Sequence, residues 1–161
     1  MKMMKMKMIV CAALVSCLVF AAAGYTASFP EDLVKKMAAM KADAEAKKEM
    51  PATIDGLPIV DTEAAHKLLK GKAIFLDNRV KTQFDTEKIA GAQWFFCDTL
   101  IKDPARADKL DKSKEYVVYC NGVFCWRSPA VGMMLKQLGF TKVFWYRDGL
   151  PAWKKKGLPT E

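Results

Sequence analysis

The chain has 161 residues, 52% of them hydrophobic, and a formal net charge of +8. This length predicts one domain with a substantial core. The basic residues form no cluster interleaved with stacking aromatics, which argues against nucleic-acid binding and leaves small anions or acidic protein surfaces as fitting ligands. A single histidine and the lack of a Cys-x-x-Cys pair argue against a metal site.

Residues 1–24 have the order that is typical of a secretory signal peptide. Residues 1–8 contain three lysines and no acid, residues 9–23 are apolar apart from one serine, and small residues precede the polar sequence. We therefore expect export to the periplasm, contact with the membrane only through this segment, and a net charge of +5 after cleavage. The alternative is a membrane anchor, through an uncleaved N-terminus or a lipid on Cys17.

Export also changes the cysteine count. Cleavage would remove Cys11 and Cys17 and leave Cys97, Cys120 and Cys125. Because three is an odd number, at least one thiol would stay free or pair outside the chain in an oxidising compartment.

Residues 25–53 read as a helical extension or linker. Ser28 and Glu31 are spaced as a capping box, helix formers continue to Met50, and Pro51 ends the run. The extension either packs on the following domain or serves as a solvated connector.

Residues 54–161 alternate between strand and helix patterns. Strands are expected at 57–60, 73–76, 93–97, 116–120 and 142–146, and helices at 62–69, 128–138 and 151–156. Short buried strands that alternate with helices indicate an α/β domain, with a mainly parallel sheet flanked by helices on both faces.

The loop after the fourth strand carries the clearest chemical signal. Cys120 ends that strand, and ligands of open α/β sheets bind beyond the carboxyl ends of the strands. Ser128 is expected to cap the next helix, so helix N–H groups and the Arg127 charge would lower the Cys120 pKa and make it a nucleophile. Gly122 permits a backbone nest for an anion. The expected binding loop is Asn121, Gly122, Val123, Phe124, Cys125, Trp126 and Ser128.

An ordered set of motifs then supports a family resemblance. The motifs are Leu76-Asp77-Asn78-Arg79, Ile89-Ala90-Gly91-Ala92, Tyr119-Cys120, Arg127-Ser128, Leu138-Gly139-Phe140, and Asp148-Gly149 with Trp153. In this order they resemble a single rhodanese-like domain over about residues 55–160.

The resemblance implies a sulfurtransferase cycle without metal or organic cofactor. Cys120 would take a sulfur from a small anionic donor such as thiosulfate as a persulfide, and pass it to a thiol acceptor, which can be a protein. The loop amides would hold the persulfide and Arg127 the anionic donor. Asp77 and Arg79 would brace the fold.

Two departures from the family pattern leave alternatives open. Arg127 stands seven residues after Cys120, two more than in a standard sulfurtransferase loop, and phosphatases and arsenate reductases of this fold also use longer loops. Cys125-Trp126 resembles the Cys-Trp pair of a subgroup of exported rhodanese-like proteins. Cys125 could form a disulfide with Cys120 in a thiol–disulfide redox module, form a permanent bridge, or face inward as a small hydrophobe. Besides sulfur transfer and thiol–disulfide exchange, the chain could bind sulfur compounds or anions without catalysing a reaction.

Overall fold

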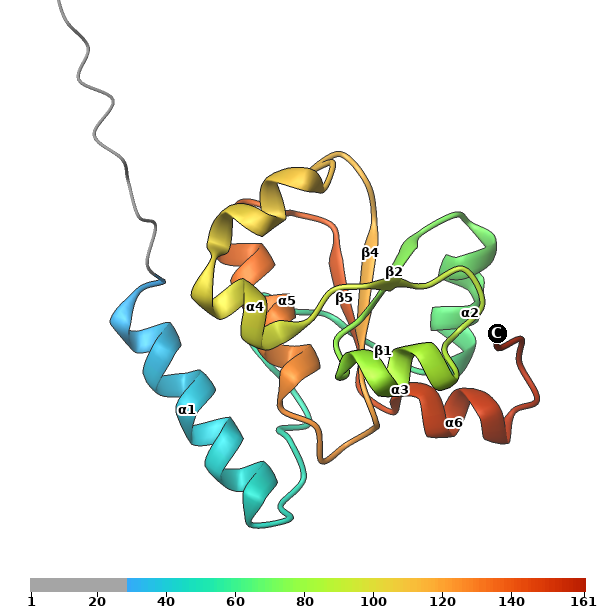
Figure 1. The fold of residues 1–161 in the computed structure, drawn as a ribbon, viewed down its shortest axis with the longest axis horizontal. Helices are drawn as coiled ribbons and strands as arrows, with labels where there is room; N and C mark the ends of the chain where they lie inside the picture. Colours follow the sequence, from blue (N-terminus) through green and yellow to red (C-terminus); the bar gives the residue numbers. More distant parts are fainter. Residues whose placement is uncertain (1–28) are drawn as a thin grey trace, which may run out of the picture.

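The computed structural model describes residues 29–161, so the predicted signal peptide (1–24) and the capping residue Ser28 lie outside the described residues. Five parallel strands form one sheet in the order β1-β5-β4-β2-β3 (Figure 1). The strands are β1 (Ile59–Val60), β2 (Ile74–Asp77), β3 (Gln93–Trp94), β4 (Tyr116–Tyr119) and β5 (Val143–Tyr146). The helices are α1 (Glu31–Glu45), α2 (Thr62–Lys70), α3 (Lys81–Thr86), α4 (Cys97–Lys102), the 3-10 helix η1 (Pro104–Lys109), α5 (Arg127–Gln137) and α6 (Gly149–Lys155).

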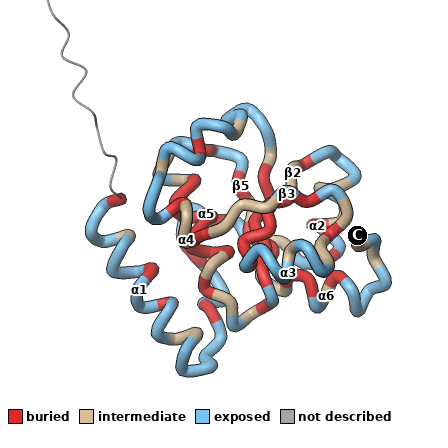
Figure 2. The backbone as a smooth tube through the Cα atoms, in the orientation of Figure 1, coloured by how far each residue is buried: buried red, intermediate tan, exposed pale blue. Residues whose placement is uncertain are grey.

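The central strand β4 divides the hydrophobic core into two layers. Its side chains alternate between the faces of the sheet, as the period of two in a strand requires. Tyr116 and Val118 pack in the cluster that includes residues of α1, α4 and α5, whereas Val117 and Tyr119 pack with residues of α2 and α6. Figure 2 shows the buried backbone concentrated in the strands and α5. The predicted α/β fold with helices on both faces is confirmed.

Helix starts follow side-chain chemistry, but not always as predicted. The Asp61 carboxylate accepts a hydrogen bond from the Ala64 N–H at 2.8 Å, which caps α2. The predicted cap at Ser128 is wrong, because α5 begins at Arg127. The Ser128 hydroxyl instead accepts a hydrogen bond from the buried Trp145 indole N–H at 3.0 Å.

The N-terminal extension packs on the domain. Its helix α1 begins after Pro30 and ends at Glu45, not at Met50 as predicted. Residues 46–50 leave the helix axis, with Lys47 in the left-handed region at φ 55°, and this bend brings Met50 into the core with 1% of its surface exposed. The extension is therefore a contributor to the core of the α/β domain.

The sequence patterns do not predict three short elements, α3, α4 and η1. Each has six residues, too few for a helical period to appear in the pattern of apolar residues. The strand expected at 93–97 ends at Trp94. The Phe95 N–H still donates a hydrogen bond to the Asp77 carbonyl at 2.9 Å, but beyond Phe95 the chain leaves the sheet, and α4 begins at Cys97.

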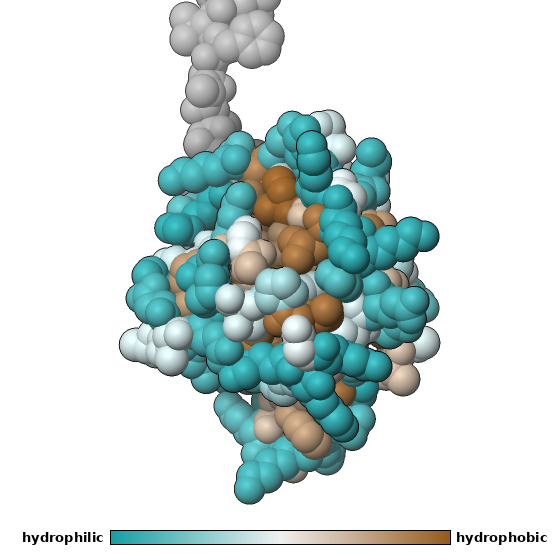
Figure 3. All heavy atoms as spheres, turned by 90° about the vertical axis from the view of Figure 1, so that its right-hand side faces the viewer, coloured by the Kyte–Doolittle hydropathy of each residue, from teal (hydrophilic) through white to brown (hydrophobic). Residues whose placement is uncertain are grey.

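The face that carries α2 and the C-terminal segment is covered largely by hydrophilic side chains, with hydrophobic groups gathered between them (Figure 3). Within residues 29–161 no helix combines the length and the apolar character that crossing a membrane requires.

Candidate functional site

Cys120 follows the last residue of β4, at the carboxyl edge of the sheet and between the ends of β2 and β5. Only 2% of its surface is exposed. Its carbonyl accepts a hydrogen bond from the Leu150 N–H at 3.0 Å. At Gly149, where φ is 61°, a Cβ would lie 2.7 Å from the Gly122 nitrogen, so only glycine lets α6 begin against the loop. The start of α6 thus fixes the position of the cysteine.

A disulfide joins Cys120 to Cys125, with 6.2 Å between their Cα atoms. The loop closes on itself because Gly122 adopts φ 100° and its carbonyl accepts a hydrogen bond from the Cys125 N–H at 3.0 Å. Cys125 therefore does not face inward as an unpaired hydrophobe. Cys120 can act as a nucleophile only after this disulfide has been opened, since the thiolate is the reactive form.

Contacts from distant segments hold the first half of the loop. The Asn121 side-chain amide donates to the Gln83 side chain at 3.1 Å. The Val123 carbonyl accepts from the Met50 N–H at 2.8 Å, and the Met50 carbonyl in turn accepts from Arg147 at 2.8 Å. The bend after α1 thus acts as a strap over the loop, and sequence reasoning gave no signal for it.

The loop amides leave donors for a ligand. Within the described part of the chain no acceptor pairs with the N–H groups of Asn121, Gly122, Val123 or Phe124. Such successive N–H groups in a tight loop suit an anion or a persulfide. Of the two aromatic loop residues, Trp126 is 8% exposed and Phe124 is 53% exposed.

Arg127 begins α5 and faces α4. Its guanidinium pairs with the Asp98 carboxylate at 3.2 Å and lies over the rings of Phe96 and Trp126, 5.5 and 5.3 Å from their centroids. The side chain also lines an opening of about 390 Å³ next to Cys125. Asp98 was not anticipated, because nothing in the sequence identified the short helix that carries it.

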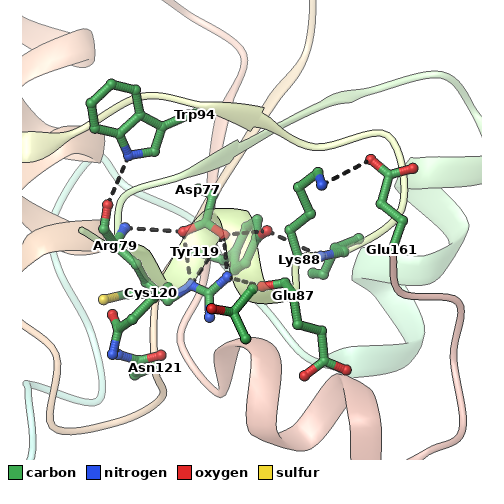
Figure 4. A network of polar contacts seen from close by, with 12 residues as sticks. Asp77, Arg79, Glu87, Lys88, Trp94, Tyr119, Cys120, Asn121 and Glu161 are labelled. Atoms are coloured by element: carbon green, nitrogen blue, oxygen red, sulfur yellow. Dashed lines mark hydrogen bonds and ion pairs between the residues drawn. The ribbon is translucent and has the colours of Figure 1, made fainter. Parts of the chain in front are cut away.

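A second arginine–aspartate pair is buried under the end of β4 (Figure 4). Arg79 donates to both carboxylate oxygens of Asp77, at 2.9 and 2.6 Å, and to the Glu87 carbonyl at 2.5 Å. The Tyr119 hydroxyl donates to the same carboxylate at 2.7 Å and accepts from the Ile89 N–H at 3.2 Å. Burial, reinforced by the Asp77 charge, raises the pKa of Tyr119 well above its usual range. This network joins the ends of β2 and β4 directly before Cys120.

Cys97 takes no part in the loop. It is fully buried at the start of α4, and burial raises the pKa of its thiol far above the usual range. Within residues 29–161 no three His, Cys, Asp or Glu side chains gather into a group that could hold a metal ion.

The sequence profile of the rhodanese-like domain matches residues 61–156. None of the curated proteins compared with this chain matches it. Among solved structures, a rhodanese-like domain from Anabaena sp. is 31% identical, covering 65% of this chain and 78% of that one, with a TM-score of 0.55. A protein from Lactobacillus plantarum is 27% identical, covering 64% of this chain and 87% of that one, with a TM-score of 0.55.

A thiosulfate sulfurtransferase from Pseudomonas aeruginosa shares the fold at 23% identity and a TM-score of 0.52, covering 81% of this chain and 23% of that one. The profile match covers more than half of the chain, and the matched region contains the network, Cys120 and the start of α6. The chain belongs to the rhodanese-like domain family.

Proposed function

We propose that this chain is a sulfurtransferase that carries the transferred sulfur as a persulfide on Cys120. The observation that carries the proposal is the position of Cys120, at the end of the central strand of a rhodanese-like domain and at the start of a loop with unpaired N–H groups. Such N–H groups stabilise negative charge on a thiolate or a persulfide.

The cycle begins when a dithiol reduces the Cys120–Cys125 disulfide and is itself oxidised to a disulfide. The Cys120 thiolate attacks the outer sulfur of thiosulfate, the sulfur–sulfur bond of the donor breaks, and sulfite leaves with the bonding electrons. An acceptor thiolate then attacks the outer sulfur of the persulfide and returns Cys120 as a thiolate. Arg127, at the opening beside Cys125, supplies positive charge for the anionic donor.

The disulfide favours a second candidate, a thiol–disulfide redox module. In that function Cys120 and Cys125 would cycle between dithiol and disulfide and exchange two electrons with a partner dithiol. No sulfur atom would be transferred.

Mass spectrometry of the reduced protein after thiosulfate treatment tests the proposal. We expect a gain of about 32 Da on Cys120, which corresponds to one sulfur. The gain should be absent in Cys120→Ser and retained in Cys97→Ser, which keeps both loop cysteines. A loss of about 2 Da, caused by a disulfide between Cys120 and Cys125, would support the redox module instead. No mass change at all would leave a non-enzymatic binding protein.

A further inference from the structure

The two cysteines of the disulfide differ in exposure. Cys120 is 2% exposed, whereas Cys125 is half-buried and lines the opening of about 390 Å³. Lys41 and Glu45 of α1 and the exposed Phe124 line the same opening. A thiolate approaching from solvent therefore meets Cys125 first.

An apolar groove between α1 and α4 continues from this opening. It encloses about 330 Å³ and shares Lys41, Trp126 and Arg127 with the opening. Three of the four large exposed hydrophobic residues within 29–161 line the two spaces: Val34 at 47%, Ile101 at 37% and Phe124 at 53%. Exposed apolar side chains gathered beside a reactive bond are typical of a protein-binding surface.

The rim of the groove is basic. Lys41, Lys102 and Arg127 line it, and Asp98 is the acidic residue on the same wall. Asp98 pairs with Arg127 and Glu45 pairs with Lys41, whereas Lys102 makes no ion pair with any described residue. The rim therefore complements an apolar segment that carries an acidic residue.

We propose that a protein dithiol docks in this groove through such a segment and opens the disulfide by attacking Cys125. The proposal rests on the proposed function, which requires a reduced Cys120. It assigns distinct parts to the two cysteines, with Cys125 as the entry sulfur and Cys120 as the leaving thiolate.

The exchange has two steps. A partner thiolate attacks the Cys125 sulfur, a mixed disulfide forms, and the Cys120–Cys125 bond breaks with its electron pair leaving on Cys120. The second partner thiolate then attacks the partner's own sulfur in the mixed disulfide, and Cys125 leaves as a thiolate that takes a proton from water. The partner loses two electrons and becomes a disulfide, while this chain gains them.

Trapping identifies the entry sulfur. The probe is a bacterial thioredoxin whose second active-site cysteine is replaced by serine, mixed with the full-length oxidised chain. After an acid quench, alkylation and digestion, we expect thioredoxin on Cys125 and the alkyl group on Cys120. Thioredoxin on Cys120, or no mixed disulfide, would overturn the proposal.

A matched pair of variants tests the groove. Ile101 and Val80 are both 37% exposed, but only Ile101 lines the groove. We expect Ile101→Asp to slow reduction by intact thioredoxin about tenfold and Val80→Asp to change it by less than about twofold. Reduction by dithiothreitol, which needs no docking surface, should be equally fast in both.

Equal thioredoxin rates in the two variants would refute docking in the groove. Persulfide formation on Cys120 is measured after dithiothreitol reduction, which bypasses the partner. A failure there would count against the sulfurtransferase function, whereas a failure of the thioredoxin experiments alone would count against this inference.

Discussion

Arg79 and Arg127 each pair with an aspartate near the end of β4, but their surroundings differ. The Arg79 side chain is 5% exposed and that of Asp77 is 0% exposed, whereas Arg127 and Asp98 are 30% and 36% exposed. Arg79 also binds the Glu87 carbonyl, and its carboxylate partner accepts from Tyr119. Arg127 has aromatic rings and solvent around it instead.

This difference in burial decides which of the two arginines can leave its aspartate for another partner. A buried pair with several hydrogen bonds cannot exchange partners without leaving a charge uncompensated. A pair that is about one third exposed loses less when it opens, because water can reach both groups. We therefore expect Arg79 to hold the strand ends, and we propose that Arg127 exchanges Asp98 for an anionic donor.

The largest expected effect is on stability. Arg79→Ala leaves the buried Asp77 carboxylate without its ion pair and should lower the free energy of unfolding by about 3–5 kcal/mol. Arg127→Ala should lower it by about 1 kcal/mol or less. Urea unfolding of the two variants measures the contrast. If Arg79→Ala does not fold, Arg79→Lys replaces it in the comparison. The lysine keeps the charge but loses the bidentate contact, and it should still lower the free energy of unfolding more than Arg127→Ala does.

Tyr119→Phe should destabilise the protein less than Arg79→Ala. It removes one hydrogen bond to the Asp77 carboxylate and should lower the free energy of unfolding by about 1.5–3 kcal/mol at neutral pH. The raised pKa of Tyr119 adds a pH dependence, because the folded chain holds the phenol proton more tightly than the unfolded chain does. The contribution of Tyr119 to the free energy of unfolding is fully present below the ordinary tyrosine pKa of 10.0 and is lost as the pH rises above that value.

Unfolding curves between pH 8 and pH 11 measure this dependence. Above pH 10 the wild type should lose up to about 1.4 kcal/mol per pH unit more than Tyr119→Phe does. Parallel pH profiles for the two proteins would show that the Tyr119 hydroxyl is not held by the network.

The sequence predicted the features that local patterns encode. Residues 62–69 read as a helix, the run 116–119 as a buried strand and Cys120 as its end, since each signal depends on neighbours within a few residues. The α/β fold follows from such signals because a parallel sheet needs a crossover between successive strands.

The contacts that shape the site join distant residues and leave no local pattern. The strap pairs Met50 with Val123, and the partly exposed ion pair joins Asp98 to Arg127 across 29 positions. Ser128 shows the same limit, because a serine before a helix reads as a cap unless the indole that claims its hydroxyl is known. The buried Asp77–Arg79 pair was more accessible to sequence reasoning, since its partners lie two residues apart.

Arg127→Ala should also change the proposed reaction. Loss of a charged partner for the donor should raise the KM for thiosulfate about tenfold in the reduced protein, with kcat changed by less than about threefold. Sulfite release at varied thiosulfate concentration measures both constants. A large fall in kcat with an unchanged KM would instead give Arg127 a part in the transition state, and no change in either would remove it from the site.

Asp98→Asn should have the smallest effect and the opposite sign. The amide keeps the shape of the side chain but no longer neutralises Arg127, so the KM for thiosulfate should fall about twofold, with a stability change of about 1 kcal/mol or less. If Asp98 acts only by occupying Arg127, the same substitution in the Arg127→Ala background should leave KM unchanged, because the two changes then share one interaction. A fall in KM that persists in the double variant would mean that the Asp98 charge repels the donor directly.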